Sequence, residues 1–247
     1  MHWGRSRYIF VIGSGRSGTN YLGRVIGKHP DVKMMLEDSR TFKKSVSASV
    51  QHLGDEKKYR ELKKTYKRLQ WTIFKPVILE KSHTNLWIVE KLANDFPDAL
   101  FVGIQRDVYQ TVYSMVNHKG VKRWFDLLGS REQSPFLGIN KGNREFYEDL
   151  PIESKCAIRW LSHQKRLEGL KAQFPDRVHI VDYDQLVRNF DGEVLKLSEF
   201  TSLDLLPHAE KPRFQPLNKW KNFSDTAIAH IDEILERETH NPHYFVG

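Results

Sequence analysis

The segment Tyr8-Ile-Phe-Val-Ile-Gly-Ser-Gly-Arg-Ser-Gly-Thr-Asn-Tyr-Leu-Gly-Arg-Val-Ile26 decides the fold of this chain. Its apolar start, residues 8–12, predicts a buried strand, and the glycine-rich run after it predicts a turn. Leu22, Val25 and Ile26 recur on one face of an expected helix over residues 19–28. A glycine loop between a strand and a helix presents backbone N–H groups and a helix N-terminus, so we expect it to bind an anion such as phosphate.

The loop resembles the phosphate-binding pattern G-x-x-x-x-G-K-[ST] but differs from it at the diagnostic positions. Gly13 and Gly18 have the spacing of that pattern. Thr19 stands where the lysine would be, and Asn20 where the Mg²⁺-binding hydroxyl would be. The cation lies inside the loop instead, as Arg16. We therefore expect a phosphate cradle that needs no metal.

Composition restricts the class of protein. A length of 247 residues is typical of one α/β domain, and we expect residues 1–247 to form it. The single cysteine, Cys156, excludes a disulfide framework within the chain and a cysteine-based zinc site. The histidines show no zinc-binding spacing, so no metal site is expected. A net charge of +8 favours anionic ligands, and no sequence signature of nucleic-acid binding accompanies it.

Two features of the sequence bear on localisation. No apolar run approaches the roughly 20 residues that a membrane-spanning helix needs. The first seven residues lack the apolar segment of a signal peptide. We therefore expect a cytoplasmic protein without a membrane span, and an excised lumenal domain is the alternative.

Apolar runs alternate with helical patterns along the chain. Strands are expected near residues 8–13, 77–79, 99–104 and 178–181, with a further short one near 32–36. Helices are expected at 19–28, 55–70, 84–95, 108–117, 152–174, 192–200 and 225–238. This order predicts an α/β, P-loop-like three-layer fold: a parallel sheet of four or five strands with helices on both faces. Residues 120–150 show weak periodicity and are expected to form an irregular lid or acceptor-binding insertion.

Ligands of such sheets bind at the carboxyl ends of the strands, which directs attention to the polar residues there. Four motifs occur in those loops and near the C-terminus. They are Gly15-Arg-Ser-Gly-Thr-Asn-Tyr21, Arg106 with Ser114, Tyr183-Asp184, and Arg213 with Trp220. In this order and position they resemble the sulfotransferases that use 3′-phosphoadenosine 5′-phosphosulfate (PAPS).

The resemblance implies a set of donor contacts. The 5′-phosphosulfate would be bound by the loop, at Gly15, Arg16, Ser17, Gly18, Thr19 and Asn20. The 3′-phosphate would be bound by Arg106 and Ser114, with Tyr183 at the adenine and Arg213 as a further contact. Physically, two separate anionic groups need two separate anion sites, and an arginine can bind a phosphate through two hydrogen bonds. Taken alone, Arg106 is better explained by a strand-end salt bridge with Asp107 or Asp184, and Ser114 at the matching spacing favours ligand binding instead.

The resemblance leaves the general base open between two residues of one loop. Lys81-Ser82-His83 is similar to the Lys-Thr-His of cytosolic sulfotransferases, whose histidine is the base. Glu80-Lys81-Ser82 is similar to the Glu-Lys-Ser/Thr of heparan-sulfate-type enzymes, whose glutamate is the base. The histidine is suited to neutral pH, whereas the glutamate needs desolvation to raise its pKa. Arg16 and Lys81 are the candidates for stabilising the departing 5′-phosphate.

The sequence thus predicts a sulfotransferase that acts on an acceptor hydroxyl or amine. Two alternatives are a P-loop kinase of a small metabolite and a non-catalytic nucleotide- or nucleic-acid-binding protein. The acceptor is expected to be read by residues 120–150, with 38–52 as a further candidate. Cations and aromatic rings alternate in 120–150, which suits a glycan or another small molecule but also the anchoring of a lid. These residues are Arg123, Trp124, Phe125, Arg131, Arg144 and Tyr147.

Overall fold

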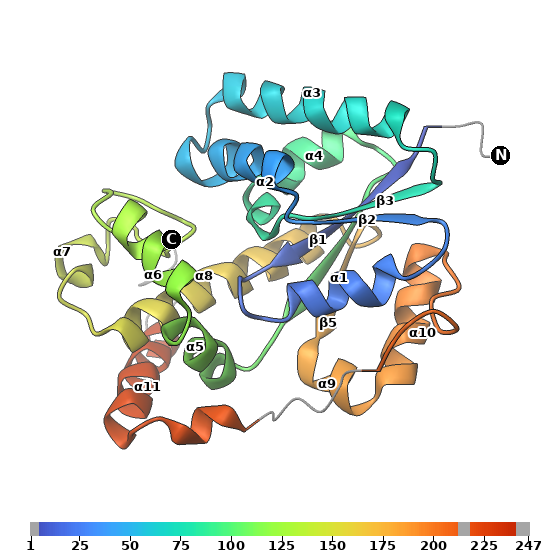
Figure 1. Ribbon diagram of the computed structural model, residues 1–247. Coiled ribbons are helices and arrows are strands. Elements are labelled where there is room, and N and C mark those ends of the chain that lie inside the picture. The colour runs from blue at the N-terminus through green and yellow to red at the C-terminus, as the bar shows by residue number, and fades with distance from the viewer. Residues whose placement is uncertain (1–4, 212–217, 241–247) are drawn as a thin grey trace.

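A five-stranded parallel sheet forms the centre of the protein in a computed structural model, which describes residues 5–211 and 218–240 (Figure 1). The strand order is β2-β3-β1-β4-β5, and each neighbouring pair is parallel. The strands are β1 (Arg7–Gly13), β2 (Val32–Leu36), β3 (Val77–Lys81), β4 (Leu100–Gln105) and β5 (Val178–Asp182). The predicted parallel sheet is confirmed, including the short strand near 32–36.

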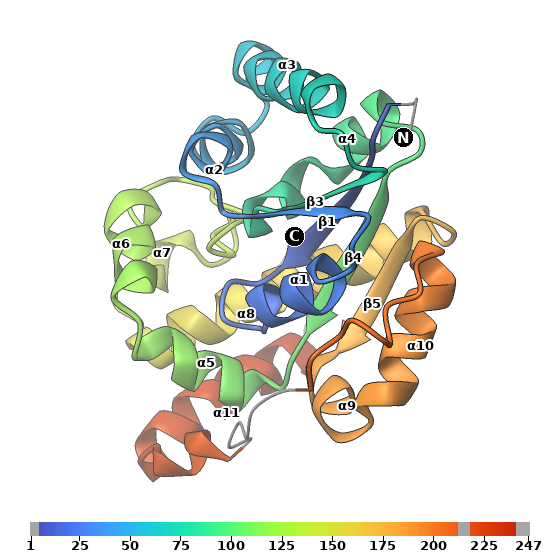
Figure 2. The same ribbon diagram turned by 45° about the vertical axis from the view of Figure 1, so that its right-hand side comes forward.

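Helices cover both faces of the sheet (Figures 1 and 2). One face packs against α1 (Thr19–Gly27), α9 (Tyr183–Arg188) and α10 (Phe190–Thr201). The other face packs against α3 (Glu56–Thr72), α4 (Val89–Asp95) and α8 (Ile152–Gln173). The three-layer α/β fold is therefore the predicted one, although α9 had no signal strong enough to be predicted as a helix.

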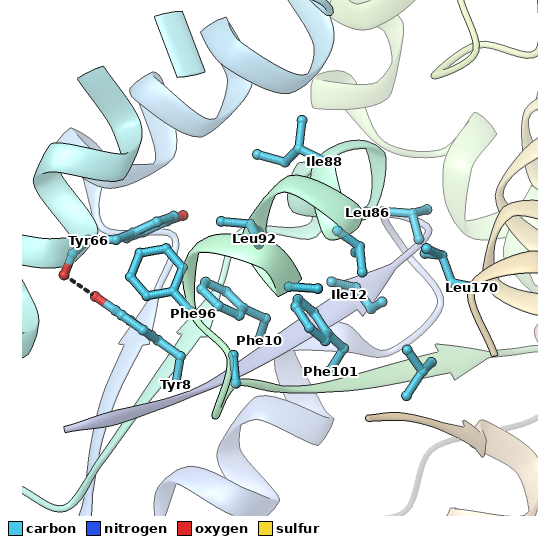
Figure 3. Packing of buried hydrophobic residues seen from close by; sticks show 14 of the residues in the cluster. Tyr8, Phe10, Ile12, Tyr66, Leu86, Ile88, Leu92, Phe96, Phe101 and Leu170 are labelled. Carbon is cyan, nitrogen blue, oxygen red and sulfur yellow. Dashed lines mark hydrogen bonds between the residues drawn. The ribbon is translucent and has the colours of Figure 1, made fainter. Parts of the chain in front are cut away.

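Strand β1 shows why the sequence folds this way. Its side chains alternate between the two faces, with Ile9 and Val11 toward α1, and Tyr8 and Phe10 toward α3. All four are fully buried, and each such side chain contributes about 1.5–3 kcal/mol through burial. Aromatic rings stack on one another in the α3 layer, and the Tyr8 hydroxyl donates to the Tyr66 carbonyl oxygen at 2.8 Å (Figure 3).

The segment after β3 differs from the expected helix over 84–95. Residues His83–Ile88 form a 3-10 turn, η2, and the α-helix begins only at Val89. The Asn85 side chain donates to the Tyr66 hydroxyl at 2.9 Å and to Glu80 at 2.7 Å. These side-chain contacts fix the first residues in the tighter turn.

Residues 120–150 contain more helix than the sequence analysis indicated. They follow α5 (Val108–Val116) and hold most of α6 (Lys119–Leu128) and all of α7 (Arg144–Tyr147). The prediction of an irregular segment was wrong for α6. Its apolar residues do have helical spacing, but Gly120 and the surrounding cations obscured the pattern. They are Val121, Trp124, Phe125 and Leu128.

Three further elements complete the described chain. Residues 38–52 hold α2 (Ser39–Val46) and a π-helical turn, η1 (Ser47–Gln51), which no pattern predicted. A 3-10 turn, η3 (Lys219–Asn222), precedes α11 (Asp225–His240). Ser224 caps α11, because its Oγ accepts from the Ala227 N–H at 3.2 Å. Within the described residues every helix is too short or too polar to cross a membrane.

Candidate active site

The glycine loop lies at the carboxyl end of the central strand β1. Its backbone is left-handed at Gly18 (φ 107°) and also at Arg16 (φ 80°), which is uncommon for a residue with a side chain. A Cβ on Gly18 would lie 2.7 Å from Cε2 of Tyr183 and closer still to Cδ2. The Ser17 hydroxyl and N–H both donate to the Ser14 carbonyl oxygen, at 2.6 and 3.2 Å. The loop is therefore tight, and the Ser17 side chain is hydrogen-bonded inside it.

A cavity of about 440 Å³ opens beside this loop. Arg16 joins two of the predicted motifs across it, because its Nε donates to Ser114 Oγ at 3.1 Å. Among the described residues, the lining contains four Arg and Lys side chains and no carboxylate. The lining residues are Arg16, Gly18, Thr19, Asn20, Tyr21, Arg24, Arg106, Gln110, Tyr113, Ser114, Asn117, His118, Tyr183, Lys219 and Trp220.

The cavity gathers most of the predicted donor-binding residues. Gly15 and Ser17 lie on the loop itself, and Arg213 lies outside the described residues. Sequence reasoning missed several lining residues that helical spacing could have found. Arg24 is one turn beyond Asn20, and Gln110 is one turn from both Arg106 and Ser114.

Arg106 is held in a fixed orientation at the end of β4. Its Nε and Nη2 donate to Gln110 Oε1 at 3.1 and 2.9 Å, and its guanidinium stacks 4.3 Å from the centre of the Tyr183 ring. Gln110 donates in turn to Asp184 at 2.9 Å. The salt bridge to Asp184 that was the alternative reading is thus replaced by a link through Gln110. Burial lowers the pKa of Arg106.

Glu37 is a site residue that sequence reasoning missed. It follows edge strand β2 with a left-handed backbone (φ 50°), and its N–H donates to the Lys81 carbonyl oxygen at 3.0 Å. Its Oε1 accepts from Lys81 Nζ at 2.5 Å and lies 2.9 Å from His83 Nδ1. Applying the strand-end rule to residues 32–36 would have found it.

The charges of this cluster are strongly coupled. Burial acts to raise the pKa of Glu37, but the hydrogen bonds and charges of His83 and Lys81 outweigh it and lower the pKa to about 2. Burial lowers the pKa of Lys81, which is 2% exposed, and Glu37 opposes that effect. Burial also lowers the pKa of His83, again against the hydrogen bond to Glu37. At neutral pH the carboxylate is therefore ionised, and the imidazole is neutral.

His83 lies directly behind the glycine loop. The position that a Cβ would take on Gly15 is 3.6 Å from His83 Nε2. This nitrogen is buried and has no hydrogen-bond partner among the described residues. The ring packs between Phe42 of α2 and Phe136 of the 120–150 segment, with ring centres 5.7 and 6.2 Å away. Both segments proposed to read an acceptor thus meet at His83.

Glu80, the other candidate base, points to the opposite face of the sheet. Successive side chains of a strand alternate, so Lys81 faces α1 while Glu80 faces the α3 layer beside Ile78. The Glu80 carboxylate is fully buried and accepts from the Ser82 hydroxyl at 2.6 Å and from Asn85 at 2.7 Å. Burial raises its pKa to about 7, against the hydrogen bonds from Ser82.

Two cations of the 120–150 segment anchor that segment. Arg131 donates to the Val50 carbonyl oxygen at 3.2 Å, and Arg144 donates to the Gly129 carbonyl oxygen at 2.7 Å. Tyr147 is buried. Within the described chain, no group of three or more His, Cys, Asp and Glu side chains is arranged to hold a metal ion.

Known structures share this architecture. The sulfotransferase domain of the Synechococcus PCC 7002 olefin synthase is 14% identical, with a TM-score of 0.57 over 95% of this chain and 96% of that one. A sulfotransferase from Alicyclobacillus acidocaldarius is 14% identical, with a TM-score of 0.52 over 94% and 96%. Mouse SULT7A1, solved in complex with PAP, is 17% identical, with a TM-score of 0.50 over 98% and 88%. At these identities the likeness shows the fold.

The sequence itself identifies the family. Among curated proteins, none matches this chain significantly. The model of the sulfotransferase family, in contrast, matches residues 8–207, which span the sheet, the glycine loop, the Glu37 cluster and Arg106. This match covers most of the chain, and the protein therefore belongs to the sulfotransferase family.

Proposed function

We propose that the protein transfers a sulfuryl group from PAPS to a hydroxyl or amine of an acceptor. The observation that carries the proposal is the cation-lined cavity between the glycine loop and Arg106, in which Arg16 contacts Ser114. Family membership favours this activity over the kinase and nucleic-acid-binding alternatives.

The residues present fit the donor nucleotide. Its product, adenosine 3′,5′-bisphosphate (PAP), carries two separate anionic groups, and the cavity offers separate cations for them. Arg16 and the N-terminus of α1 suit the 5′ side, whereas Arg106 and Ser114 suit the 3′-phosphate. Tyr183 and Trp220 supply aromatic surface for the adenine. The absence of a carboxylate from the described lining favours a polyanion of this kind.

We propose the Glu37–His83 pair as the proton acceptor. The acceptor oxygen forms a bond to sulfur, its proton moves to the pair, and the bond between sulfur and the bridging oxygen breaks. The bridging oxygen keeps the electron pair and leaves with the 5′-phosphate, where Arg16 and Lys81 stabilise the charge. Glu37, about a third exposed, offers the accessible end of the pair, and the unpartnered His83 Nε2 faces the loop.

Glu80 fits this role less well. Its carboxylate is fully buried, hydrogen-bonded to Ser82 and Asn85, and on the opposite face of β3 from Lys81. We therefore propose that Glu80 supports the loop structurally. The acceptor would enter beside Phe42 and Phe136, between α2 and the 120–150 segment, which we propose as the acceptor-binding insertion.

Calorimetric titration tests the donor assignment. The protein should bind PAP more tightly than adenosine 5′-phosphate, and Arg106→Ala should remove most of that preference. A charge-assisted pair of hydrogen bonds corresponds to about a tenfold to hundredfold change in affinity. Arg60→Ala, at an exposed position of α3, is the matched control and should retain the preference. Equal affinity of the unaltered protein for the two nucleotides would overturn the donor assignment.

Turnover tests the base assignment. A screen of hydroxyl- and amine-bearing acceptors with donor carrying radiolabelled sulfate identifies a substrate class. With that substrate, Glu37→Gln and His83→Gln should each lower kcat by about a hundredfold or more while PAP still binds. Glu80→Gln should retain most of kcat. Loss of kcat in Glu80→Gln alone, with folding and PAP binding intact, would transfer the role to Glu80.

A further inference from the structure

Arg159 on α8 is a buried cation that no carboxylate of residues 5–211 and 218–240 pairs with. Arg159 is 1% exposed, and its Nε and Nη1 atoms are buried with no hydrogen-bond partner among the described residues. Its guanidinium stacks over the Phe136 ring, 4.4 Å from the ring centre, a cation–π contact that supplies neither a hydrogen-bond acceptor nor a negative charge. Burying a charge without a partner is costly, so such a residue calls for an explanation.

The titratable groups around Arg159 supply no negative charge at neutral pH. Burial raises the pKa of Cys156 to about 12 and also raises that of Tyr147, so both are neutral. Burial lowers the pKa values of His83 and His163, so both imidazoles are neutral. Burial lowers the pKa of Arg159 itself to about 10, which leaves it positively charged. The missing anion is therefore expected to come from a ligand.

The same helix shows how an arginine is satisfied when its role is structural. Arg166 lies two turns further along α8. Its Nη1 and Nη2 donate to the two carboxylate oxygens of Glu90 at 2.7 and 2.5 Å, and its Nε donates to the Leu86 carbonyl oxygen at 3.1 Å. Arg159 has no comparable set of partners in the described structure.

The position of Arg159 indicates which anion it meets. Its Nη2 lies 3.4 Å from the point where a Cβ of Gly15 would be, and His83 Nε2 lies 3.6 Å from the same point. Gly15 has no side chain to occupy this space. An oxygen atom displaced from that point toward Arg159 by a few tenths of an ångström would come within hydrogen-bond distance of Nη2. The neutral His83 donates its Nδ1–H to Glu37, so its Nε2 is an acceptor and stays available for the proton of the acceptor hydroxyl.

We propose that Arg159 is a further catalytic residue, whose guanidinium binds the oxygens of the sulfuryl group of the donor at Gly15. This inference rests on the proposed function and deepens it. Arg159 donates hydrogen bonds to the sulfuryl oxygens while the acceptor oxygen bonds to sulfur and the bridging oxygen leaves. The absence of a side chain at Gly15 allows the sulfuryl group to approach.

The contrast between PAPS and PAP isolates this contact, because PAP lacks the sulfuryl group. Calorimetry without an acceptor should show that the unaltered protein binds PAPS more tightly than PAP. Arg159→Met should reduce the ratio of the two affinities by about tenfold or more and leave PAP binding unchanged. Arg166→Met, the matched control, should leave that ratio unchanged.

Thermal unfolding of the ligand-free protein gives a second readout. Arg159→Met should unfold at the same temperature as the unaltered protein or a higher one, because it removes an unpaired buried charge at similar volume. Arg166→Met should lower Tm by about 2 °C or more, because it breaks a paired contact. If Arg159→Met does not fold, Arg159→Gln keeps polarity without charge and is measured in the same way.

The outcomes separate this inference from the proposed function. If the unaltered protein binds neither nucleotide, the proposed function itself fails. If it binds both and the ratio is unchanged in Arg159→Met, only the role of Arg159 fails. An equal loss of PAP and PAPS affinity would place Arg159 at the 5′-phosphate and likewise overturn the contact with the sulfuryl group.

Discussion

Replacement of Gly18 by alanine tests whether the cradle depends on close contact with Tyr183. An alanine at φ 107° costs about 1–2 kcal/mol through backbone strain alone. Its Cβ would also lie within 2.7 Å of the Tyr183 ring, which is 3% exposed and stacked on Arg106. Displacing such a ring adds about 1–3 kcal/mol. We expect Gly18→Ala to destabilise the protein by about 2–5 kcal/mol in total.

Gly54 provides the matched control for the cost of placing an alanine in a left-handed backbone conformation. Its φ is 93°, close to that of Gly18, but a Cβ there would meet nothing within 4 Å. Gly54→Ala should therefore cost about 1–2 kcal/mol and leave PAP affinity unchanged. The assay is thermal unfolding of both variants followed by circular dichroism, where 1 kcal/mol corresponds to about 2–4 °C for a chain of this size.

Nucleotide affinity completes this test. Because the Arg106 guanidinium stacks on the Tyr183 ring, displacement of the ring should lower the affinity of Gly18→Ala for PAP by about tenfold or more. The reasoning is refuted if Gly18→Ala and Gly54→Ala lose equal stability, since the ring contact would then cost nothing. It is also refuted if Gly18→Ala binds PAP as tightly as the unaltered protein does.

Two further predictions rest on buried titratable groups, and a third rests on helix propensity at an exposed position. The rise in the pKa of Glu80 from 4.5 to about 7 corresponds to about 3 kcal/mol of stability, which is present below pH 4.5 and lost as pH rises through 7. Between pH 4.5 and 8, the free energy of unfolding of the unaltered protein should therefore fall by about 3 kcal/mol relative to that of Glu80→Gln. Urea unfolding of both proteins at the two pH values measures this difference. The acid limb of kcat/KM, which reports the free enzyme, should lie below pH 6.5 because burial lowers the pKa of His83, and a limb near 7 would point to Glu80. Gly169→Ala, in α8 with nothing within 4 Å, should raise stability by about 1 kcal/mol, and an unchanged Tm would contradict this.

Local pattern was enough to predict the sheet and several of the residues that line the cavity. In β1 the apolar residues occupy both faces, which is the pattern of a buried parallel strand. Arg106 and Ser114 share one strand-helix unit, so their spacing along the chain fixes their proximity to each other. The pairing of β4 with β1 brings both to the glycine loop.

Residues brought together by tertiary packing could not be predicted in this way. Glu37 reaches His83 because β2 pairs with β3, and the two residues are 46 positions apart in sequence. Arg159 looks like an ordinary cation of an amphipathic helix, and nothing in the sequence of α8 distinguishes it from Arg166. Its lack of a partner becomes visible only when its neighbours are known. Glu80 and Lys81 are adjacent in sequence, yet strand alternation places them on opposite faces.

The strand order gives Glu37 a special place in the energetics of the protein. Strand β2 lies at the edge of the sheet and pairs only with β3 among the described strands, whereas β1 and its glycine loop lie in the centre. Edge elements open locally with smaller free energies than central ones, and amide hydrogen exchange detects such openings. A fluctuation that detaches β2 would separate Glu37 from His83 and leave the nucleotide cradle intact. If Glu37 and His83 act as we propose, activity should therefore be lost on warming before the fold and nucleotide binding are lost.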